Sequence, residues 1–307
     1  MGKLGQFSYA ETTWIIPKLS TMNTYNRILL VLLLFSPCLL LSSQTNKIAV
    51  DLFSSGNKLN AHLYLPDSNH TNPTLIMLHG YPGGEGDPLG LGESLSTLGI
   101  NVLVFNYQGT WSSEGDFSFE SSMNDVSNAI RFLKEKENMQ RFNVDTSKII
   151  VGGYSFGGAM ALTEAIYNPE IKRIISIGGA DESVFGDKML SDTEFRSMFE
   201  DMLKKTEYPE GPVKVDIDSQ SEFWLSNLDK FDQVKHAKSL MNRDILFIFG
   251  WDDVNVIPEE HVLPLFRKLR SLNAENIRIE SFMTDHSFRN VREEMTHTIF
   301  KWIINEE

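Results

Sequence analysis

A serine set between two glycines is the most reactive arrangement in this sequence. The segment Lys148–Leu162 begins as a β-branched run, passes through Gly153-Tyr154-Ser155-Phe156-Gly157 and continues into small, apolar residues that favour a helix. The glycines two positions before and after Ser155 leave room for a sharp turn between strand and helix, which exposes the serine Oγ above the edge of a sheet. The segment therefore predicts an exposed nucleophile, although such a turn also occurs without any chemistry.

A serine hydroxyl becomes a good nucleophile only when a base accepts its proton and a third group orients that base. Seven histidines are present, and among them His286 follows the last predicted strand and precedes the final predicted helix. Loops at the carboxyl ends of parallel strands meet at one edge of a sheet, so His286 is the candidate base. The orienting acid is expected after the preceding strand, where Asp252 and Asp253 are both available, and the sequence alone leaves these two open.

A glycine-containing turn after the third predicted strand offers the remaining part of the chemistry. His79-Gly80-Tyr81 follows the apolar run Thr74–Leu78, and the main-chain N–H of Tyr81 is expected to lie opposite that of Phe156. Two such donors would form an oxyanion hole for the charge that develops on a carbonyl oxygen. His79 itself is expected to stabilise the turn rather than to act in catalysis.

Eight predicted strands alternate with helices and place these loops. The first two form a hairpin around Ser54-Ser55-Gly56-Asn57, and most later strands are apolar runs typical of strands buried on both faces. The expected strands cover 47–53, 59–65, 74–78, 101–107, a run that begins near 147, 171–177, 244–249 and 277–282. Pro258 is expected to open a helix that Pro264 kinks or restarts. The alternation predicts an α/β fold with a mostly parallel sheet and right-handed crossovers.

The alternation stops between about residues 182 and 243, which are rich in aromatic, methionine and acidic residues. We interpret this part as a helical lid inserted over the mouth of the site, where it would determine specificity. A helical crossover packed on the sheet edge is the alternative interpretation. Glu182, Asp187 and Glu200 are candidates to attract a positively charged amino group of a substrate.

The composition limits the partners that the protein can have. The 307 residues carry a formal charge of −13, so the protein is expected to repel nucleic acid and anionic lipid. The single cysteine, Cys38, precedes the first predicted strand, so the predicted domain has no disulfide, thiolate metal ligand or cysteine nucleophile. Neither a His-Glu-x-x-His motif nor a phosphate-binding glycine loop occurs, and the sequence therefore predicts no metal and no cofactor.

Residues 1–44 are expected to act as a targeting signal rather than as part of the folded domain. Ile28–Leu41 is an almost unbroken apolar run, interrupted by Pro37, and is shorter than the ~20 residues that span a bilayer. It has the character of a secretory signal, with Met22 as an alternative start of the chain. The protein is therefore expected to be secreted or periplasmic after cleavage of a signal peptide, or held at a membrane by an uncleaved leader.

Taken together, these motifs resemble the α/β-hydrolase superfamily over nearly all of the chain after residue 44. Phe249–Asp253 and Thr284–Phe288, together with the Ser155 turn, are similar to the catalytic domain of prolyl oligopeptidase-like serine peptidases and their single-domain hydrolase relatives. The resemblance implies an α/β-hydrolase domain over residues 45–307, with an eight-stranded, mostly parallel sheet flanked by helices and the lid inserted at about 182–243.

The resemblance also implies a role for each candidate residue. Ser155 is then the nucleophile and His286 the general base. Asp253 is favoured over Asp252 as the orienting acid, because the family spacing matches an acid three residues after Gly250.

The function that the resemblance implies is that of a serine hydrolase, which cleaves a carboxylic ester or a peptide bond through an acyl-enzyme on Ser155. Two departures from the large peptidases keep both the esterase and the peptidase reading open. Too few residues precede the first predicted strand for an N-terminal propeller, and Gln108 stands where many relatives have arginine. The expected substrate is a small ester or a short peptide. The alternatives are an acyltransferase with the same triad and a catalytically silent binding module on the same fold.

Overall fold

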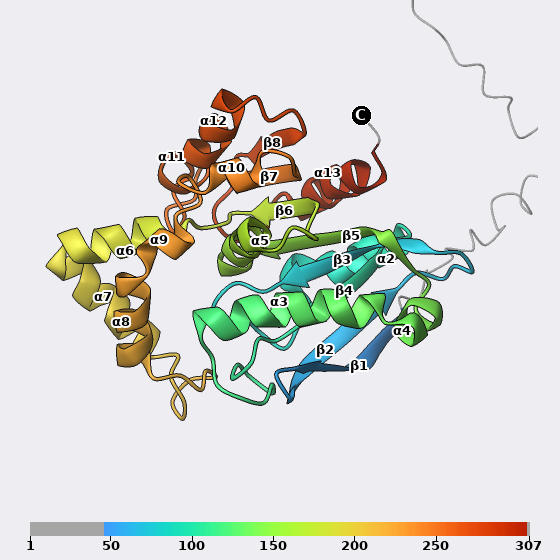
Figure 1. The fold of residues 1–307 in the computed structure, drawn as a ribbon, viewed down its shortest axis with the longest axis horizontal. Coiled ribbons are helices and arrows are strands. Elements are labelled where there is room, and N and C mark those ends of the chain that lie inside the picture. Colours follow the sequence, from blue (N-terminus) through green and yellow to red (C-terminus); the bar gives the residue numbers. More distant parts are fainter. Residues whose placement is uncertain (1–45, 306–307) are drawn as a thin grey trace, which may run out of the picture. The chain divides into compact units, whose positions relative to one another are not determined.

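A computed structural model describes residues 46–305 (Figure 1). The predicted leader, residues 1–44, lies outside the described residues, so its role stays a prediction. Within the described part of the chain, none of the helices combines the length and the apolar character needed to cross a membrane.

One sheet of eight strands organises the domain. Its strands are β1 (Asn46–Ser54), β2 (Asn57–Leu65), β3 (Asn72–Leu78), β4 (Asn101–Phe105), β5 (Val144–Tyr154), β6 (Arg173–Ile177), β7 (Asp244–Gly250) and β8 (Ile277–Phe282). They lie in the order β1-β2-β4-β3-β5-β6-β7-β8. The pairs β1–β2 and β2–β4 are antiparallel, and every other neighbouring pair is parallel. The predicted α/β-hydrolase fold, with its mostly parallel eight-stranded sheet, is confirmed.

Helices cover both faces of the sheet (Figure 1). The helices outside the segment between β6 and β7 are the short 3-10 helix η2 (Pro88–Gly90), α2 (Leu91–Thr97), α3 (Phe119–Lys134), α4 (Lys136–Arg141), α5 (Phe156–Tyr167), α11 (Pro258–His261), α12 (Leu263–Ser271) and α13 (Arg292–Ile304). Alternate residues of β3 divide between two cores: Ile76 and Leu78 pack with α3 and α5, whereas Leu75 and Met77 pack with α2 and α13. Successive strand residues point to opposite faces, and both faces are covered, which is why Leu75–Leu78 are all apolar.

Pro264 restarts a helix, as predicted. Helix α11 ends at His261 and α12 begins at Leu263, with Pro264 in its first turn. Proline has no N–H to donate to the preceding turn, and a helix tolerates it only near its start. The two short helices therefore replace one longer helix after β7.

Strand β4 ends at Phe105, two residues earlier than predicted. The chain turns toward Asp125 on α3, whose carboxylate accepts hydrogen bonds from the main-chain N–H of Gln108 at 2.8 Å and from its Nε2 at 2.7 Å. Burial raises the pKa of Asp125 to about 6. The buried carboxylate thus fixes the loop that follows β4, and the pattern of apolar residues gave no sign of it.

Five helices connect β6 to β7. They are α6 (Glu182–Ser191), α7 (Thr193–Lys204), α8 (Ile217–Ser226), α9 (Leu228–Phe231) and α10 (Ala237–Leu240). Asp181, Asp192 and Asp216 cap the first three by accepting hydrogen bonds from main-chain N–H groups of the first turn. Helices α6, α7 and α8 extend beyond the sheet on one side of the molecule (Figure 1). We refer to α6–α8 as the lid helices.

The lid helices are fastened to the loop after β4. The N–H of Lys214 donates to the carbonyl of Gly109 at 2.7 Å, and the N–H of Phe117 donates to the carbonyl of Lys214 at 2.8 Å. A further hydrogen bond of 2.6 Å joins the hydroxyls of Tyr81 and Thr206. The segment between α7 and α8 is therefore tied to the loops that surround Ser155.

Candidate active site

Ser155 occupies a strained turn between β5 and α5. Its backbone angles are φ 55° and ψ −120°, outside the regions that residues with a side chain usually adopt. Such strain costs about 1–3 kcal/mol and persists only where the surroundings impose it. The Ser155 N–H donates to the carbonyl of Ile177 at 2.9 Å, and its carbonyl accepts from the N–H of Ala159 at 3.0 Å. The sharp turn expected from Gly-x-Ser-x-Gly is present.

Two glycines make this turn sterically possible. A Cβ on Gly153 would lie 2.2 Å from the carbonyl carbon of Gly157. A Cβ on Gly157 would lie 2.5 Å from the carbonyl oxygen of Leu78. Helix α5 thus packs against β5 and β3 at distances that only glycine permits.

Gly153→Ala is expected to destabilise the protein by about 3 kcal/mol, because the new methyl group would overlap the backbone of α5. The measurement is chemical denaturation followed by circular dichroism. Gly84→Ala is the matched control, since a Cβ at Gly84 meets nothing within 4 Å. Equal stability of the two variants would contradict the steric argument.

Three loops at one edge of the sheet bring the candidate triad together. Ser155 follows β5, Asp253 follows β7 and His286 follows β8. The strands β5, β6, β7 and β8 are parallel neighbours, so these loops emerge side by side. His286 Nε2 lies 3.0 Å from Ser155 Oγ, and His286 Nδ1 lies 2.6 Å from Asp253 Oδ2. One chain of hydrogen bonds therefore connects the three residues that the sequence singled out.

The surroundings of Asp253 orient its carboxylate. Its side chain is fully buried, and its Oδ1 accepts hydrogen bonds of 2.9 Å from the N–H groups of Asn255 and Val256. A carboxylate can only accept, so His286 Nδ1 carries the proton of the 2.6 Å hydrogen bond, and Nε2 is left to accept from the Ser155 hydroxyl. Asp252 is exposed and lies outside this chain of hydrogen bonds.

Tyr154 supports the imidazole and was not singled out from the sequence. Its ring lies against that of His286, with the centroids 4.9 Å apart and an angle of 35° between the planes. Its hydroxyl donates to the main-chain carbonyl of His286 at 2.8 Å. The position of Tyr154 beside Ser155 was visible in the sequence, but the direction of its side chain was not.

The two residues expected to supply oxyanion donors lie at the same place. Tyr81 and Phe156 both line the cavity that Ser155 and His286 also line. Gly80 packs directly on the nucleophile, since a Cβ there would lie 3.2 Å from Ser155 Cβ. Phe156 is the first residue of α5, and N–H groups in the first turn of a helix have no partner within the helix. The main-chain N–H groups of Tyr81 and Phe156 stay the predicted donors.

His79 lies behind this turn. It is buried, and burial lowers its pKa to about 4, so the imidazole is neutral at neutral pH. Its main-chain carbonyl accepts a hydrogen bond of 3.3 Å from the Tyr107 hydroxyl. This bond ties the turn after β3 to the end of β4.

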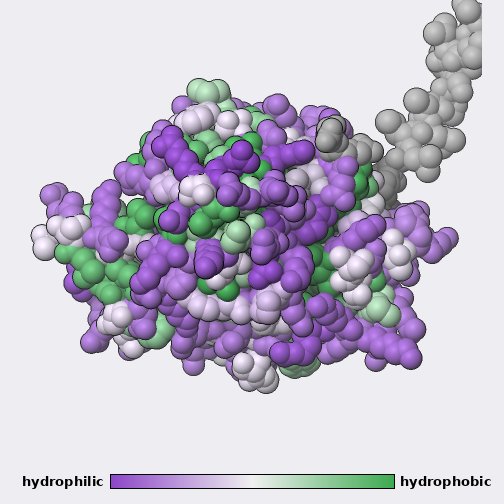
Figure 2. All heavy atoms as spheres, turned by 45° about the horizontal axis from the view of Figure 1, so that its top comes forward, coloured by the Kyte–Doolittle hydropathy of each residue, from purple (hydrophilic) through white to green (hydrophobic). Residues whose placement is uncertain are grey.

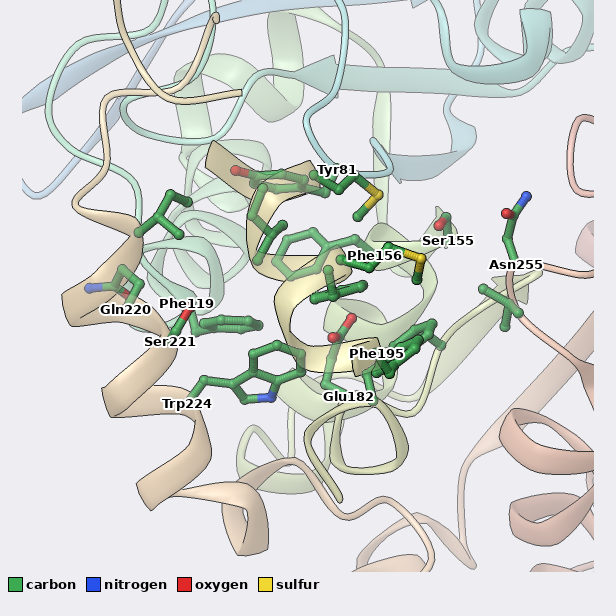
Figure 3. Close-up of a pocket in the computed structure, with 18 of the residues that line it drawn as sticks. Tyr81, Phe119, Ser155, Phe156, Glu182, Phe195, Gln220, Ser221, Trp224 and Asn255 are labelled. Atoms are coloured by element: carbon green, nitrogen blue, oxygen red, sulfur yellow. The ribbon is translucent and has the colours of Figure 1, made fainter. Parts of the chain in front are cut away.

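An apolar cavity of about 390 Å³ lies between Ser155 and the lid helices (Figure 3). Aromatic rings form much of its wall, among them those of Phe117, Phe119, Phe156, Phe185, Phe199 and Trp224. Met198 and Met202 on α7 also line it and are 60% and 50% exposed, so the cavity reaches the surface beside α7. Figure 2 shows hydrophobic residues gathered at the end of the molecule where α6 and α7 lie.

One of the three acidic residues considered from the sequence lines this cavity. Glu182, at the start of α6, is part of its wall, whereas Asp187 and Glu200 are not. Asp187 is exposed on α6. It follows Glu182 by five residues, and with about 3.6 residues per turn it therefore lies on a different face of the helix. Glu200 pairs with Arg196 at 2.9 Å. Asp187 and Glu200 therefore do not contact a group bound in this cavity, and any attraction of an amino group by them stays a prediction.

Metal ligands are not gathered in the part of the chain that the structure describes. Across residues 46–305, no group of three histidine, cysteine, aspartate or glutamate side chains is placed to hold a metal ion.

Comparison with known proteins identifies related families. A model of the prolyl oligopeptidase family matches residues 93–306, which include Ser155, Asp253 and His286. The thiohydrolase aneE of Aspergillus aculeatus is 29% identical over 142 residues, which cover 45% of this chain and 42% of that protein. A proline iminopeptidase of Saccharolobus solfataricus is 29% identical over 119 residues, 37% of this chain and 35% of that protein. The chain thus spans less than half of the length of these two relatives.

Solved structures share the fold. Est1E from Butyrivibrio proteoclasticus superposes with a TM-score of 0.59 at 16% sequence identity, covering 84% of this chain and 98% of Est1E. At this level of identity the likeness concerns the fold alone.

Proposed function

This chain belongs to the prolyl oligopeptidase family, and we propose that it is a serine hydrolase that cleaves a carboxylic ester or amide bond through an acyl-enzyme on Ser155. One observation carries the proposal: the hydrogen bonds that link Ser155, His286 and Asp253 at 3.0 and 2.6 Å, beside an apolar cavity. Family membership favours hydrolysis over simple binding.

Acylation begins when Ser155 Oγ attacks the carbonyl carbon of the substrate and transfers its proton to His286 Nε2. The imidazolium that forms is stabilised by the buried carboxylate of Asp253, which stays ionised. The negative charge on the carbonyl oxygen is met by the main-chain N–H groups of Phe156 and Tyr81. His286 then gives its proton to the leaving alcohol, thiol or amine as the bond to the carbonyl carbon breaks.

Deacylation repeats these steps with water. His286 Nε2 removes a proton from a water molecule, which attacks the acyl carbon of the ester on Ser155. Collapse of the second tetrahedral intermediate returns the proton from His286 to Ser155 Oγ and releases a carboxylic acid. The same two donors hold the oxyanion in both halves, and their fixed position lowers both barriers.

The cavity supports a substrate with a small or medium-sized, largely apolar acyl group. A volume of about 390 Å³ lies within the range of small-molecule sites. We propose a small ester or a short peptide as the substrate. One of the two relatives is named a thiohydrolase and the other an iminopeptidase, and these names support a thiol or an amine as further possible leaving groups.

Hydrolysis of p-nitrophenyl esters of increasing acyl length, compared with aminoacyl and dipeptidyl nitroanilides, tests this function. We expect kcat/KM for the esters to rise with length until the cavity is filled and then to fall, because each buried methylene contributes up to about 0.8 kcal/mol. The nitroanilides decide between esterase and peptidase. A purified, folded protein that hydrolyses neither series would contradict the proposal.

We also propose that the protein is exported, on the basis of the apolar run Ile28–Leu41. The measurement is fractionation of cells that express the full-length chain, with the mass of the recovered protein. Full-length protein in the cytoplasmic fraction alone would contradict export.

A further inference from the structure

Among residues 46–305, Glu182 is the one acidic side chain along the wall of the cavity beside Ser155. It is only 6% exposed, and no hydrogen bond or ion pair to its carboxyl group is made by the described residues. In Figure 3 the carboxyl group of Glu182 points toward the ring of Phe156, among the residues that line the cavity. Ionising a buried carboxyl group that has no partner is costly, so a group that pairs with Glu182 would be favoured in this cavity.

The residues around Glu182 do not supply the missing partner. Burial, reinforced by the negative charge of Asp181, raises the pKa of Glu182 to about 8. Asp181 itself is satisfied, because its Oδ1 accepts hydrogen bonds from the N–H of Ser183 at 3.0 Å and from its hydroxyl at 2.7 Å. The other titratable side chains of the cavity wall have partners of their own. The Tyr81 hydroxyl bonds to that of Thr206, and His286 bonds to Asp253.

Aromatic rings surround this carboxyl group. The ring centroids of Phe119 and Trp224 are 5.4 Å apart, those of Trp224 and Phe199 are 6.0 Å apart, and those of Phe199 and Phe185 are 5.5 Å apart. These four rings form a continuous wall, and Figure 3 places Phe119 and Trp224 on one side of Glu182 and Phe195 on the other. The face of an aromatic ring attracts a cation, and a desolvated site strengthens that attraction.

These properties distinguish among the groups that could enter the cavity. An alkyl group would fill the space but leave the carboxyl group unpaired, and an anion would be repelled. A neutral hydroxyl would pair with Glu182 without any gain from the ring faces. An ammonium group satisfies both, because it pairs with the carboxylate and lies against the rings, and its positive charge favours the ionised form of Glu182.

We propose that Glu182 and the four surrounding rings select substrates whose acyl part carries an ammonium group. The inference rests on the proposed function, because Ser155 supplies the other end of the same cavity. We assign the ammonium group to the acyl part of the substrate, because the acyl part stays bound to Ser155, at the end of this cavity, after the leaving group has departed. A second groove, whose lining includes Tyr154, Ser287 and Arg289, also reaches Ser155 and His286 and leaves a separate place for the leaving group.

The test uses two matched series of p-nitrophenyl esters with alkanoyl chains of increasing length. One series ends in a dimethylammonio group and the other in an isopropyl group, which has the same shape without the charge. After subtraction of the enzyme-free rate, we expect kcat/KM of the charged ester to exceed that of its neutral partner by about tenfold or more at the chain length that reaches Glu182. A ratio near one at every length would overturn the inference.

Two variants locate the origin of this preference. Glu182→Gln keeps the shape of the side chain and removes its ability to ionise beside a cation, and it is expected to bring the ratio close to one. Asp187→Asn makes the same change of charge on the same helix outside the cavity, and it is expected to retain the ratio. A preserved ratio in Glu182→Gln, or an equal loss in Asp187→Asn, would overturn the assignment to Glu182.

The same experiment separates this inference from the proposed function. Hydrolysis of both series by the wild-type protein without preference would reject the ammonium site and leave the serine hydrolase intact. Absence of hydrolysis in both series, with Ser155 unreactive toward a fluorophosphonate, would reject the proposed function itself. Because these readouts use the wild-type protein, they hold even if a variant fails to fold.

Discussion

Ser155→Ala is expected to abolish hydrolysis of every ester that the wild-type protein cleaves and to abolish labelling by a fluorophosphonate probe. Loss of the nucleophile removes the acyl-enzyme, and the expected fall in kcat is about 10⁴-fold or more. The fold is expected to survive, because the turn is held by main-chain hydrogen bonds to Ile177 and Ala159 that alanine also makes. The measurements are steady-state hydrolysis, probe labelling read by gel fluorescence and thermal melting.

The control for this variant is its melting temperature. A Ser155→Ala protein that melts close to the wild type and still reacts with the probe would remove Ser155 from its proposed role. A protein that is inactive because it is unfolded would be recognised by its circular dichroism spectrum, and Ser155→Cys then provides a variant with nearly the same shape.

Asp253→Asn is expected to lower kcat by about 10³- to 10⁴-fold, with little change in the fold. The amide oxygen can replace Oδ1 in accepting from the N–H groups of Asn255 and Val256. The amide NH₂ then faces His286 Nδ1 and makes it an acceptor, which moves the ring proton to Nε2. In that tautomer Nε2 cannot take the proton of Ser155.

Asp252→Asn is the matched control for this change. Asp252 precedes Asp253 directly but is exposed and does not contact the imidazole, so its variant is expected to retain activity within about twofold of the wild type. Steady-state kinetics on a single p-nitrophenyl ester measures both variants. A larger loss in Asp252→Asn than in Asp253→Asn would show that the other carboxylate orients the base.

The succession of strands and helices along the chain, and the positions of most strands to within a few residues, could be predicted from the sequence. Short apolar runs alternating with helical segments allow few arrangements other than a parallel sheet. Pro264 marked the break between α11 and α12 for a purely local reason, the missing N–H. Strand ends that depend on distant partners were less predictable: β4 ends where Gln108 meets Asp125, a contact across 17 positions.

In the candidate site, too, features with a local cause could be predicted, and features that depend on contacts in the folded chain could not. Ser155 and His286 could be singled out because each stands in a loop at the carboxyl end of a predicted strand. The residues alone did not separate Asp252 from Asp253, and only the family resemblance favoured Asp253. The physical difference is that the N–H groups of Asn255 and Val256 donate to Asp253. The arrangement around Glu182 was beyond prediction for a similar reason, because the rings of its cavity come from α3, α5, the lid helices and two loops and meet only in the folded chain.

The most direct test of the account is the mass of the acyl-enzyme. The wild-type protein is mixed with a p-nitrophenyl ester, quenched in acid within the first turnover and analysed by intact mass spectrometry and peptide mapping. We expect a mass increase of one acyl group, located on the peptide that contains Ser155 and absent from Ser155→Ala. Release of p-nitrophenol without any acylated protein, or an acyl group on a different residue, would contradict it.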